Sequence, residues 1–229
     1  MSTVEQIRIE HRVMPIGLDE TRPSISWELH SDEKELTQTA YRLQIQAEEG
    51  ELVYDSQEQQ SDEQLVVVSA LALAPFTKYL VTVEVQLSNG ERVSGESFFE
   101  TGILDATQFE GQWIYAPKEV KVPVFLKTLQ LPKAVRSARL AVVARGVYDV
   151  ELDGVKVGDD ILSPGWTSYT HRIPYQVYPL DLQENVGHEL AITVAPGWYA
   201  GLLGFVDERN HFGDHLSVLA QVVVQYEDG

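Results

Sequence analysis

The feature that most constrains the fold of this chain is a period-two alternation of apolar and polar residues. Residues 41–47 alternate as Tyr-Arg-Leu-Gln-Ile-Gln-Ala, and residues 81–88 alternate as Val-Thr-Val-Glu-Val-Gln-Leu-Ser. Successive side chains of a β-strand point to opposite faces, so this pattern is typical of strands with one buried face. No stretch of 11–18 residues shows a helical period that is free of an interrupting Gly or Pro. The chain is therefore predicted to be all-β.

Two dipeptides between expected strands predict hairpin turns. Asn89-Gly90 ends the run at 81–88, and Asp153-Gly154 separates two further short strands. Both dipeptides tolerate the positive φ values of a tight turn. The remaining strands are expected at 25–29, 98–101, 113–115, 124–126, 140–144, 148–152, 155–157, 190–194 and 216–224. The last of these alternates weakly, which suits a strand that is buried on both faces.

Residues 102–112 lose the alternation, which divides the chain into two predicted β-sandwiches. We assign 1–103 to a fibronectin III/immunoglobulin-like sandwich, 104–112 to a linker, and 113–229 to a second sandwich. The sequence ends on Asp228-Gly229, a turn dipeptide directly after a strong strand. A turn with no strand after it leaves a sheet edge unpaired, so we expect the natural chain to continue and the second sandwich to be truncated.

Charge and composition exclude several classes of partner. The 229 residues carry a formal net charge of −18, and 21 of the 35 acidic residues lie in residues 1–110. Nucleic acid and anionic membrane surfaces are unlikely partners for such a chain because both attract basic proteins. No cysteine is present to form a disulfide or a thiolate zinc site, and no run of about 18 apolar residues could span a membrane. The first eight residues lack a secretory signal, so we expect a cytoplasmic protein.

Two loops in the second half share the tripeptide Pro-Gly-Trp, at 164–166 and 196–198. Aromatic rings stack on the C–H face of a pyranose, while nearby polar groups bind its hydroxyls. The alternative is that Trp166 and Trp198 close the ends of the sandwich as lids on its core. The candidate carbohydrate-binding residues are Trp166, Tyr169, Trp198 and Tyr199 for stacking, and Asp159, Asp160 and Asp214 for hydroxyls or calcium.

The signals for a metal or an active site are weaker. His211 and His215 lie four residues apart beside Asp214, but Gly213 would interrupt a helix that aligned them, so no metal site is assigned. Calcium stays a candidate ligand only for oxygen clusters such as Asp159-Asp160 and Asp207-Glu208. The sequence contains no Gly-x-Ser-x-Gly elbow and no phosphate loop in a strand–loop–helix context. No catalytic residue is assigned.

An ordered set of motifs covers nearly the whole chain. They are RPSISW at 22–27, QTAYRL at 38–43, FETGIL at 99–104, WI at 113–114, GVYDVELDG at 146–154, VGD at 157–159, LSPGWTSY at 162–169 and GWYAG at 197–201. In this order the motifs resemble the N-terminal region of bacterial α-L-rhamnosidases of glycoside hydrolase family 78, from about residue 10 to residue 229. One departure is Asp153, where relatives usually carry Asn; both residues suit the turn.

The resemblance implies a fibronectin/immunoglobulin-like module followed by a jelly-roll (galactose-binding-like) module. In that family, terminal α-L-rhamnose is hydrolysed with inversion by carboxylates of an (α/α)6 barrel that comes later in the polypeptide. The chain would then be a non-catalytic, inactive fragment of an enzyme. Its partners would be the rest of its own polypeptide and rhamnose-containing glycosides. The alternative is a stand-alone carbohydrate-binding β-sandwich protein.

Overall fold

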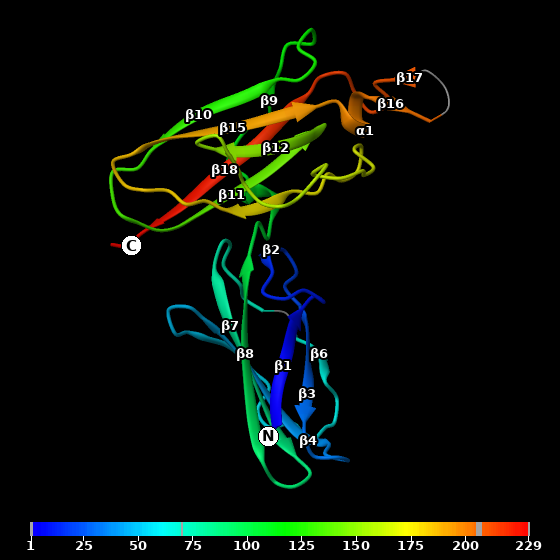
Figure 1. Cartoon of the computed structure of the whole chain (residues 1–229), viewed down its shortest axis with the longest axis vertical. Coiled ribbons are helices and arrows are strands. Elements are labelled where there is room, and N and C mark those ends of the chain that lie inside the picture. Colours follow the sequence, from blue (N-terminus) through cyan, green and yellow to red (C-terminus); the bar gives the residue numbers. More distant parts are fainter. Residues whose placement is uncertain (1, 70, 205–207, 229) are drawn as a thin grey trace. The chain divides into compact units, whose positions relative to one another are not determined.

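The protein is described by a computed structural model that covers residues 2–69, 71–204 and 208–228 (Figure 1). Asp207 and Gly229, singled out above, lie outside these ranges. Strands dominate the described residues, whose helices are the one-turn α1 (Gly197–Ala200) and the 3-10 turn η1 (Ala106–Gln108). The prediction of an all-β chain is confirmed. None of the described helices has the length and apolar character needed to cross a membrane.

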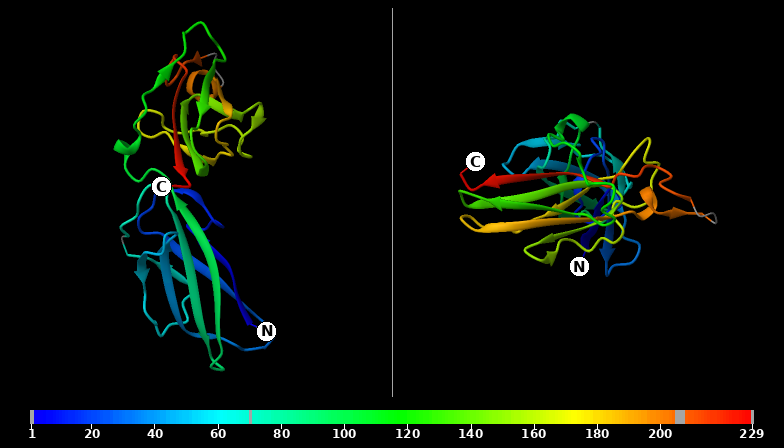
Figure 2. Two further views of the ribbon diagram at one scale, coloured as in Figure 1. Left: turned by 90° about the vertical axis from the view of Figure 1, so that its left-hand side faces the viewer. Right: turned by 90° about the horizontal axis from the view of Figure 1, so that it is seen from above.

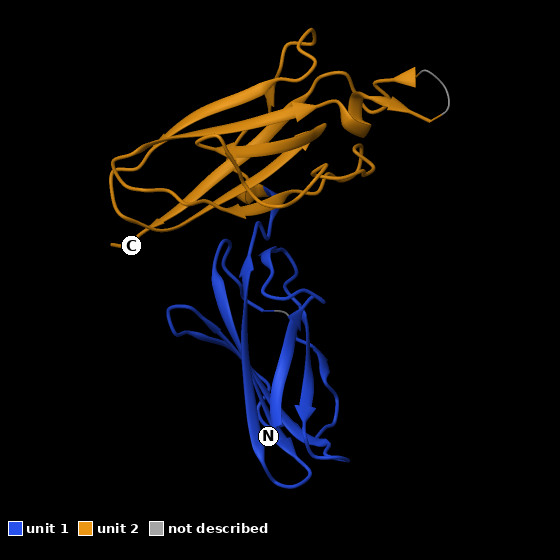
Figure 3. Cartoon of the chain, viewed as in Figure 1, with its two compact units in different colours: residues 1–106 blue, residues 107–229 orange. Residues whose placement is uncertain are grey.

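The chain forms two compact units, residues 1–106 and 107–229 (Figure 3). The first unit has two sheets whose inner faces share one apolar core, which includes Ile25, Leu43 and Val83. Trp27 packs on Tyr41 with ring centroids 5.3 Å apart. Neighbouring strands are antiparallel except β2 and β8. The smaller sheet has the order β1 (Ser2–Ile9), β3 (Ser24–Ser31), β6 (Leu65–Val67). The larger sheet has the order β2 (Ile16–Leu18), β8 (Arg92–Thr101), β7 (Lys78–Leu87), β4 (Gln38–Ala47), β5 (Leu52–Asp55).

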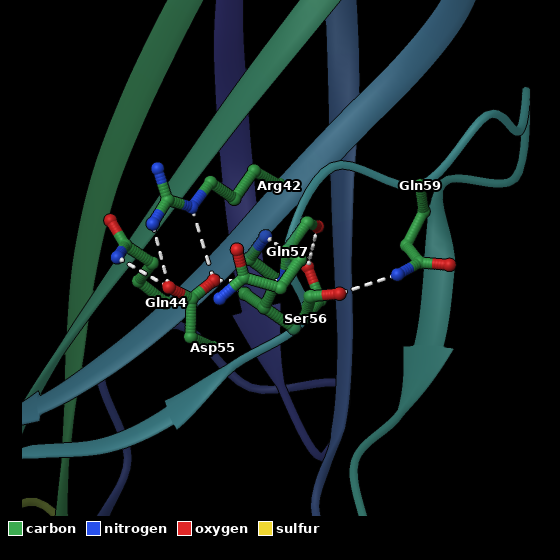
Figure 4. A network of polar contacts seen from close by, with 7 residues as sticks. Arg42, Gln44, Asp55, Ser56, Gln57 and Gln59 are labelled. Atoms are coloured by element: carbon green, nitrogen blue, oxygen red, sulfur yellow. Dashed lines mark hydrogen bonds and ion pairs between the residues drawn. The ribbon is translucent and has the colours of Figure 1, made fainter.

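An ion pair fixes the edge of the larger sheet (Figure 4). The Nε and Nη2 atoms of Arg42 on β4 donate to the two carboxylate oxygens of Asp55 on β5, at 3.0 and 2.6 Å. Gln44 Nε2 and the Gln57 amide donate to the same carboxylate at 3.1 and 2.8 Å. Chiefly because of the hydrogen bond from Arg42, the pKa of Asp55 is lowered to about 2. The carboxylate thus joins β5 to β4 by side-chain contacts in addition to the backbone ladder.

The second unit is also a two-sheet sandwich, and its strands can be followed from two further directions in Figure 2. Its core lies between the sheets and includes Leu140, Val142, Ile192 and Val218. All its strand pairs are antiparallel. One sheet has the order β10 (Val124–Gln130), β15 (Gly187–Ala195), β12 (Val147–Leu152), β13 (Val155–Lys156). The other has the order β14 (Gln176–Pro179), β11 (Val135–Arg145), β18 (Ser217–Tyr226), β9 (Ile114–Tyr115). A small third sheet pairs β16 (Leu202–Leu203) with β17 (Glu208–Arg209).

The segment that precedes β9 packs on the outer face of β18. The Gln221 side chain accepts a hydrogen bond from the Glu110 amide at 2.8 Å and donates one to the Gln108 carbonyl at 3.2 Å. Phe109 contacts Tyr175 edge to face, with centroids 5.9 Å apart. These contacts attach most of the segment that the sequence predicts as a linker to the second unit. A Cβ at Gly111 would lie 3.1 Å from Cδ1 of Leu219, so the segment also covers an outward apolar side chain near the start of β18.

The two predicted hairpins differ in their turns. Asp153 and Gly154 have φ values of +52° and +77°, as the two-residue turn between β12 and β13 requires. At the other hairpin only Gly90 has a positive φ, +86°, and the Leu87 amide donates to the Glu91 carbonyl across a longer loop. Asn89 instead uses its side-chain oxygen to accept from the Glu91 amide at 2.9 Å. The hairpin is confirmed there, but the positive φ predicted for Asn89 is wrong.

Candidate functional site

The two Pro-Gly-Trp loops come together in the second unit and bring their tryptophans into contact. The rings of Trp166 and Trp198 are nearly parallel, with an interplanar angle of 8° and centroids 6.4 Å apart. Trp198 belongs to α1 and is half-buried against the core, whereas Trp166 is 65% exposed. The core-lid alternative thus describes Trp198, while Trp166 presents an aromatic surface to solvent.

Short-range contacts position both tryptophans. Gly197 has φ +47°, and a Cβ there would lie 2.5 Å from Cγ1 of Val147, so the close approach of α1 to β12 requires glycine. On the other loop, the Thr167 hydroxyl donates to the Arg172 carbonyl at 2.8 Å, and the Gly165 amide donates to Leu162 at 2.9 Å. Trp166 is therefore exposed on a loop whose backbone is hydrogen-bonded on both sides of it.

The two candidate tyrosines lie beneath this surface. Tyr169 and Tyr199 are both buried, and their rings meet edge to face with centroids 5.2 Å apart. Tyr169 also packs on Phe212 at 5.0 Å. Burial raises the pKa of both phenols. Of the four aromatic candidates, Trp166 is the one with a largely exposed ring, while the tyrosine rings form part of the core below it.

The three candidate carboxylates have different surroundings. Asp160 accepts a hydrogen bond from the buried Tyr178 hydroxyl at 2.9 Å, and Asp159 is exposed. Asp214 pairs with Lys118, whose hydrogen bond lowers the pKa of that carboxyl, and its other oxygen lies 3.6 Å from His215. Among residues 2–69, 71–204 and 208–228, no group of three or more His, Asp or Glu side chains is arranged to hold a metal ion.

Sequence reasoning did not find a polar network that supports the Trp166 loop. The Tyr148 hydroxyl, deep in the core, contacts Gln176 Oε1 at 2.5 Å, and Ser163 Oγ lies 3.5 Å from the Tyr178 hydroxyl. Burial raises the pKa of Tyr148, so its hydroxyl stays protonated and available as a donor. Tyr148 lies on β12 and Tyr178 on β14, and both tyrosines are visible in the sequence. Whether their hydroxyls come close depends on the fold of the loop at 158–165.

A second missed cluster surrounds Arg145. Its guanidinium lies over the Trp113 ring at 4.6 Å and over the Tyr115 ring at 5.9 Å, and Nη1 donates to the Tyr115 hydroxyl at 2.8 Å. The register of β11, β18 and β9 places Arg145, Ser217 and Tyr115 side by side. Ser217 Oγ is buried and has no hydrogen-bond partner among the described residues. The cluster therefore links β9 to β11 across β18, with Ser217 buried beneath it and Tyr115 52% exposed.

Comparison with known proteins assigns both units. Residues 4–105 match the family model of the Rha78A-like, N-terminal immunoglobulin domain. Residues 133–229 match the family model of the α-L-rhamnosidase N-terminal domain.

Curated relatives and solved structures agree with these models. An α-L-rhamnosidase of Formosa agariphila is 31% identical over 242 residues, which cover 94% of this chain and 26% of that protein. One from Streptomyces avermitilis is 44% identical over 98 residues, which cover 42% of this chain and 9% of that protein. The native α-L-rhamnosidase of Aspergillus terreus superposes on this chain with a TM-score of 0.89 at 28% identity, over 100% of this chain and 28% of that one.

The enzyme from Dictyoglumus thermophilum gives a TM-score of 0.86 at 26% identity, over 99% of this chain and 28% of that one. The chain thus spans about a quarter of the length of the relatives that it matches over nearly its full extent. The two family models match the two units in the same order along the chain. The relatives that match along nearly the whole sequence are all called α-L-rhamnosidases. The chain belongs to the α-L-rhamnosidase family and corresponds to its N-terminal region.

Proposed function

We propose that this chain is the non-catalytic N-terminal part of an enzyme that hydrolyses terminal, non-reducing α-L-rhamnose from glycosides with inversion. Its two sandwiches would act as a scaffold for the catalytic (α/α)6 barrel, the partner within the same polypeptide. The observation that carries this proposal is the match of nearly the whole chain to the N-terminal quarter of proteins called α-L-rhamnosidases.

The direct test is turnover of an aryl α-L-rhamnoside by the purified chain. We expect no release of the aryl group above the uncatalysed rate, because the barrel carboxylates are supplied elsewhere. Turnover that follows the chain through successive purification steps would contradict the proposal and place the hydrolase in these two units.

We further propose that Trp166 contacts the sugar of a rhamnose-containing glycoside. Its ring is mostly exposed, and stacking on the core-packed Trp198 holds it in place without a large entropic cost on binding. An exposed indole offers an apolar face to sugar C–H groups. The carboxylates Asp159, Asp160 and Asp214 and a calcium ion remain candidates for hydroxyl binding. This contact would equally serve a stand-alone carbohydrate-binding protein, the alternative function.

Calorimetry with L-rhamnose, with calcium and then with EDTA, tests this contact. Replacing Trp166 with Ala should weaken binding by about tenfold, equivalent to about 1.4 kcal/mol, whereas Trp166→Phe should retain most of it. The melting temperature of Trp166→Ala should stay close to that of the parent chain because the ring is exposed. Equal affinities of the parent chain and Trp166→Ala would rule out this residue as the sugar contact.

A further inference from the structure

A run of exposed apolar side chains leads into the edge strand β10 of the second unit. Val120, Val122, Val124 and Leu126 are 42%, 51%, 53% and 63% exposed, and we call these four residues the apolar strip. Phe125 and Leu129 on β10 pack against the core, so Val124 and Leu126, which alternate with them, point to the outer face of the sheet. Soluble proteins rarely expose contiguous apolar surface of this kind unless another surface covers it.

The strands beside β10 extend this face. Val124 pairs with Thr193 and Leu126 with Ala191, both small residues on β15. The next strand, β12, places Asp149 opposite Thr193 and Glu151 opposite Ala191. The face is therefore apolar and flat near β10 and becomes acidic toward β12.

The acidic part of this face has an excess of negative charge. Thr128 on β10 pairs with Glu189, which is exposed like Asp149 and Glu151. Among the described residues, the cation that pairs with one of these three acids is Lys156, whose Nζ lies 3.1 Å from Asp149. A surface that covers the face would therefore be complementary if it carried apolar side chains with Lys or Arg at one border.

We propose that the apolar strip, with the small residues of β15 beside it, is where the remaining polypeptide of the α-L-rhamnosidase packs on the second unit. The proposal rests on the scaffold function proposed above. In the relatives, the part of the polypeptide outside the matched region is about three times as long as the matched region itself. A covalently linked partner is present at a high effective concentration, so a modest apolar face is enough to hold it. The edge position of β10 also leaves one side of that strand open to pairing.

The test compares the isolated chain with a hybrid in which it replaces the matched N-terminal region of the Formosa agariphila α-L-rhamnosidase. Hydroxyl-radical footprinting with mass spectrometry measures the oxidation of Leu126 in both. We expect it to fall by about fivefold in the hybrid, as for a residue in an interface core. Val155, an exposed apolar residue on β13 at the opposite edge of the same sheet, is the control and should react equally in both.

Substitution separates docking from folding. Val124→Lys with Leu126→Lys should lower the melting temperature of the hybrid and leave that of the isolated chain unchanged, and Val155→Lys should change neither. An active hybrid in which Leu126 stays fully reactive would overturn the docking surface while leaving the scaffold function standing. If deleting the whole N-terminal region from the Formosa protein changed neither its melting temperature nor its turnover, the scaffold function itself would fail. A dimeric isolated chain with a protected Leu126 would make a second copy the occupant and overturn the proposal.

Discussion

At the scale of single residues, Gly158 occupies a position that admits no side chain. Its φ is +74°, and a Cβ there would lie 2.6 Å from Cε1 of the buried Tyr178 ring. Alanine must displace either the loop or the tyrosine whose hydroxyl donates to Asp160. We expect Gly158→Ala to lower the free energy of unfolding by about 2–4 kcal/mol, the sum of backbone strain and overpacking, in urea titrations followed by fluorescence.

Gly154 provides the matched control for that substitution. Its φ of +77° is nearly the same, but a Cβ there would meet no atom within 4 Å. Gly154→Ala should therefore lose only about 1–2 kcal/mol of stability, the cost of the left-handed backbone alone. Equal losses at the two glycines would show that the contact with Tyr178 is not the cause.

The candidate site was predictable from the sequence only in part. The repeated Pro-Gly-Trp tripeptide identified two loops that the fold does bring together, since Trp166 and Trp198 stack. The sequence could not distinguish Trp166 from Tyr169, because the backbone conformation of their shared loop decides which ring faces solvent and which faces the core. Asp160 and Asp214 looked alike as free acids, yet one accepts from Tyr178 and the other pairs with Lys118. Tyr178 is 18 residues from Asp160 and Lys118 is 96 residues from Asp214, so these contacts depend on how the fold places the loops.

At the scale of elements, the Arg42–Asp55 pair makes the pairing of β5 with β4 sensitive to pH. The native pKa of Asp55, about 2, lies below the value near 3.9 expected in the unfolded chain. Its stabilisation is therefore complete above about pH 4 and is lost as the pH falls from 4 toward 2. We expect Asp55→Asn to cost about 1 kcal/mol at pH 7, since the partly exposed guanidinium is screened by solvent, and progressively less below pH 4 in urea titrations.

The exposed pair of Arg92 with Glu58 is the control for that ion pair. Its side chains are 59% and 43% exposed, and Nη2 lies 2.6 Å from Oε2. Glu58→Gln should change the free energy of unfolding by less than about 0.5 kcal/mol at pH 7. A larger effect at Glu58 than at Asp55 would contradict the view that burial decides which pair matters.

A second element-scale prediction concerns the segment attached to β18. Gln221→Ala removes the side chain that bonds Gln108 and Glu110, so amides at 107–112 should exchange with deuterium faster while the core strands keep their protection. Gln225→Ala is the control, because among the described residues that side chain bonds to the Ser137 hydroxyl, at 2.8 Å, and to none of 107–112. Unchanged exchange at 107–112 in Gln221→Ala would show that other contacts, such as that of Phe109 with Tyr175, retain the segment.

Runs that alternate without interruption were predictable, even in β4, whose register shift between Gln38 and Ala40 lies outside the run at 41–47. The runs that predicted β4 and β7 alternate throughout. β1 was missed because its buried residues, Val4, Ile7 and Ile9, are spaced by three and then two. A register shift between Glu5 and Arg8, with Gln6 at φ +49°, absorbs the extra residue. The sequence predicts a linker at 104–112, and the contacts that its later residues make with β18 leave no periodic trace in the sequence.

At the scale of the whole molecule, charge and core are both divided between the units. Each unit has its own apolar cluster, one built on Leu43 and Val83 and the other on Leu140 and Ile192. Residues 1–106 carry 20 acidic and 7 basic residues, a formal −13, whereas residues 107–229 carry 15 and 10, a formal −5. Self-repulsion therefore opposes the folding of the first unit more than that of the second.

Calorimetry of the whole chain at low and high NaCl tests this division. Raising the salt from about 10 mM to about 0.5 M shortens the Debye length from about 30 Å to about 4 Å and screens repulsion across a unit. The first unit's melting temperature should then rise by several degrees, and the second unit's by clearly less. Residues 1–106 and 107–229, produced separately, assign the two transitions and serve as each other's control. Salt also weakens local ion pairs such as Arg42–Asp55 while it screens the repulsion. An equal or larger rise in the melting temperature of residues 107–229 would therefore contradict the prediction and show that such ion pairs already offset the repulsion in the first unit.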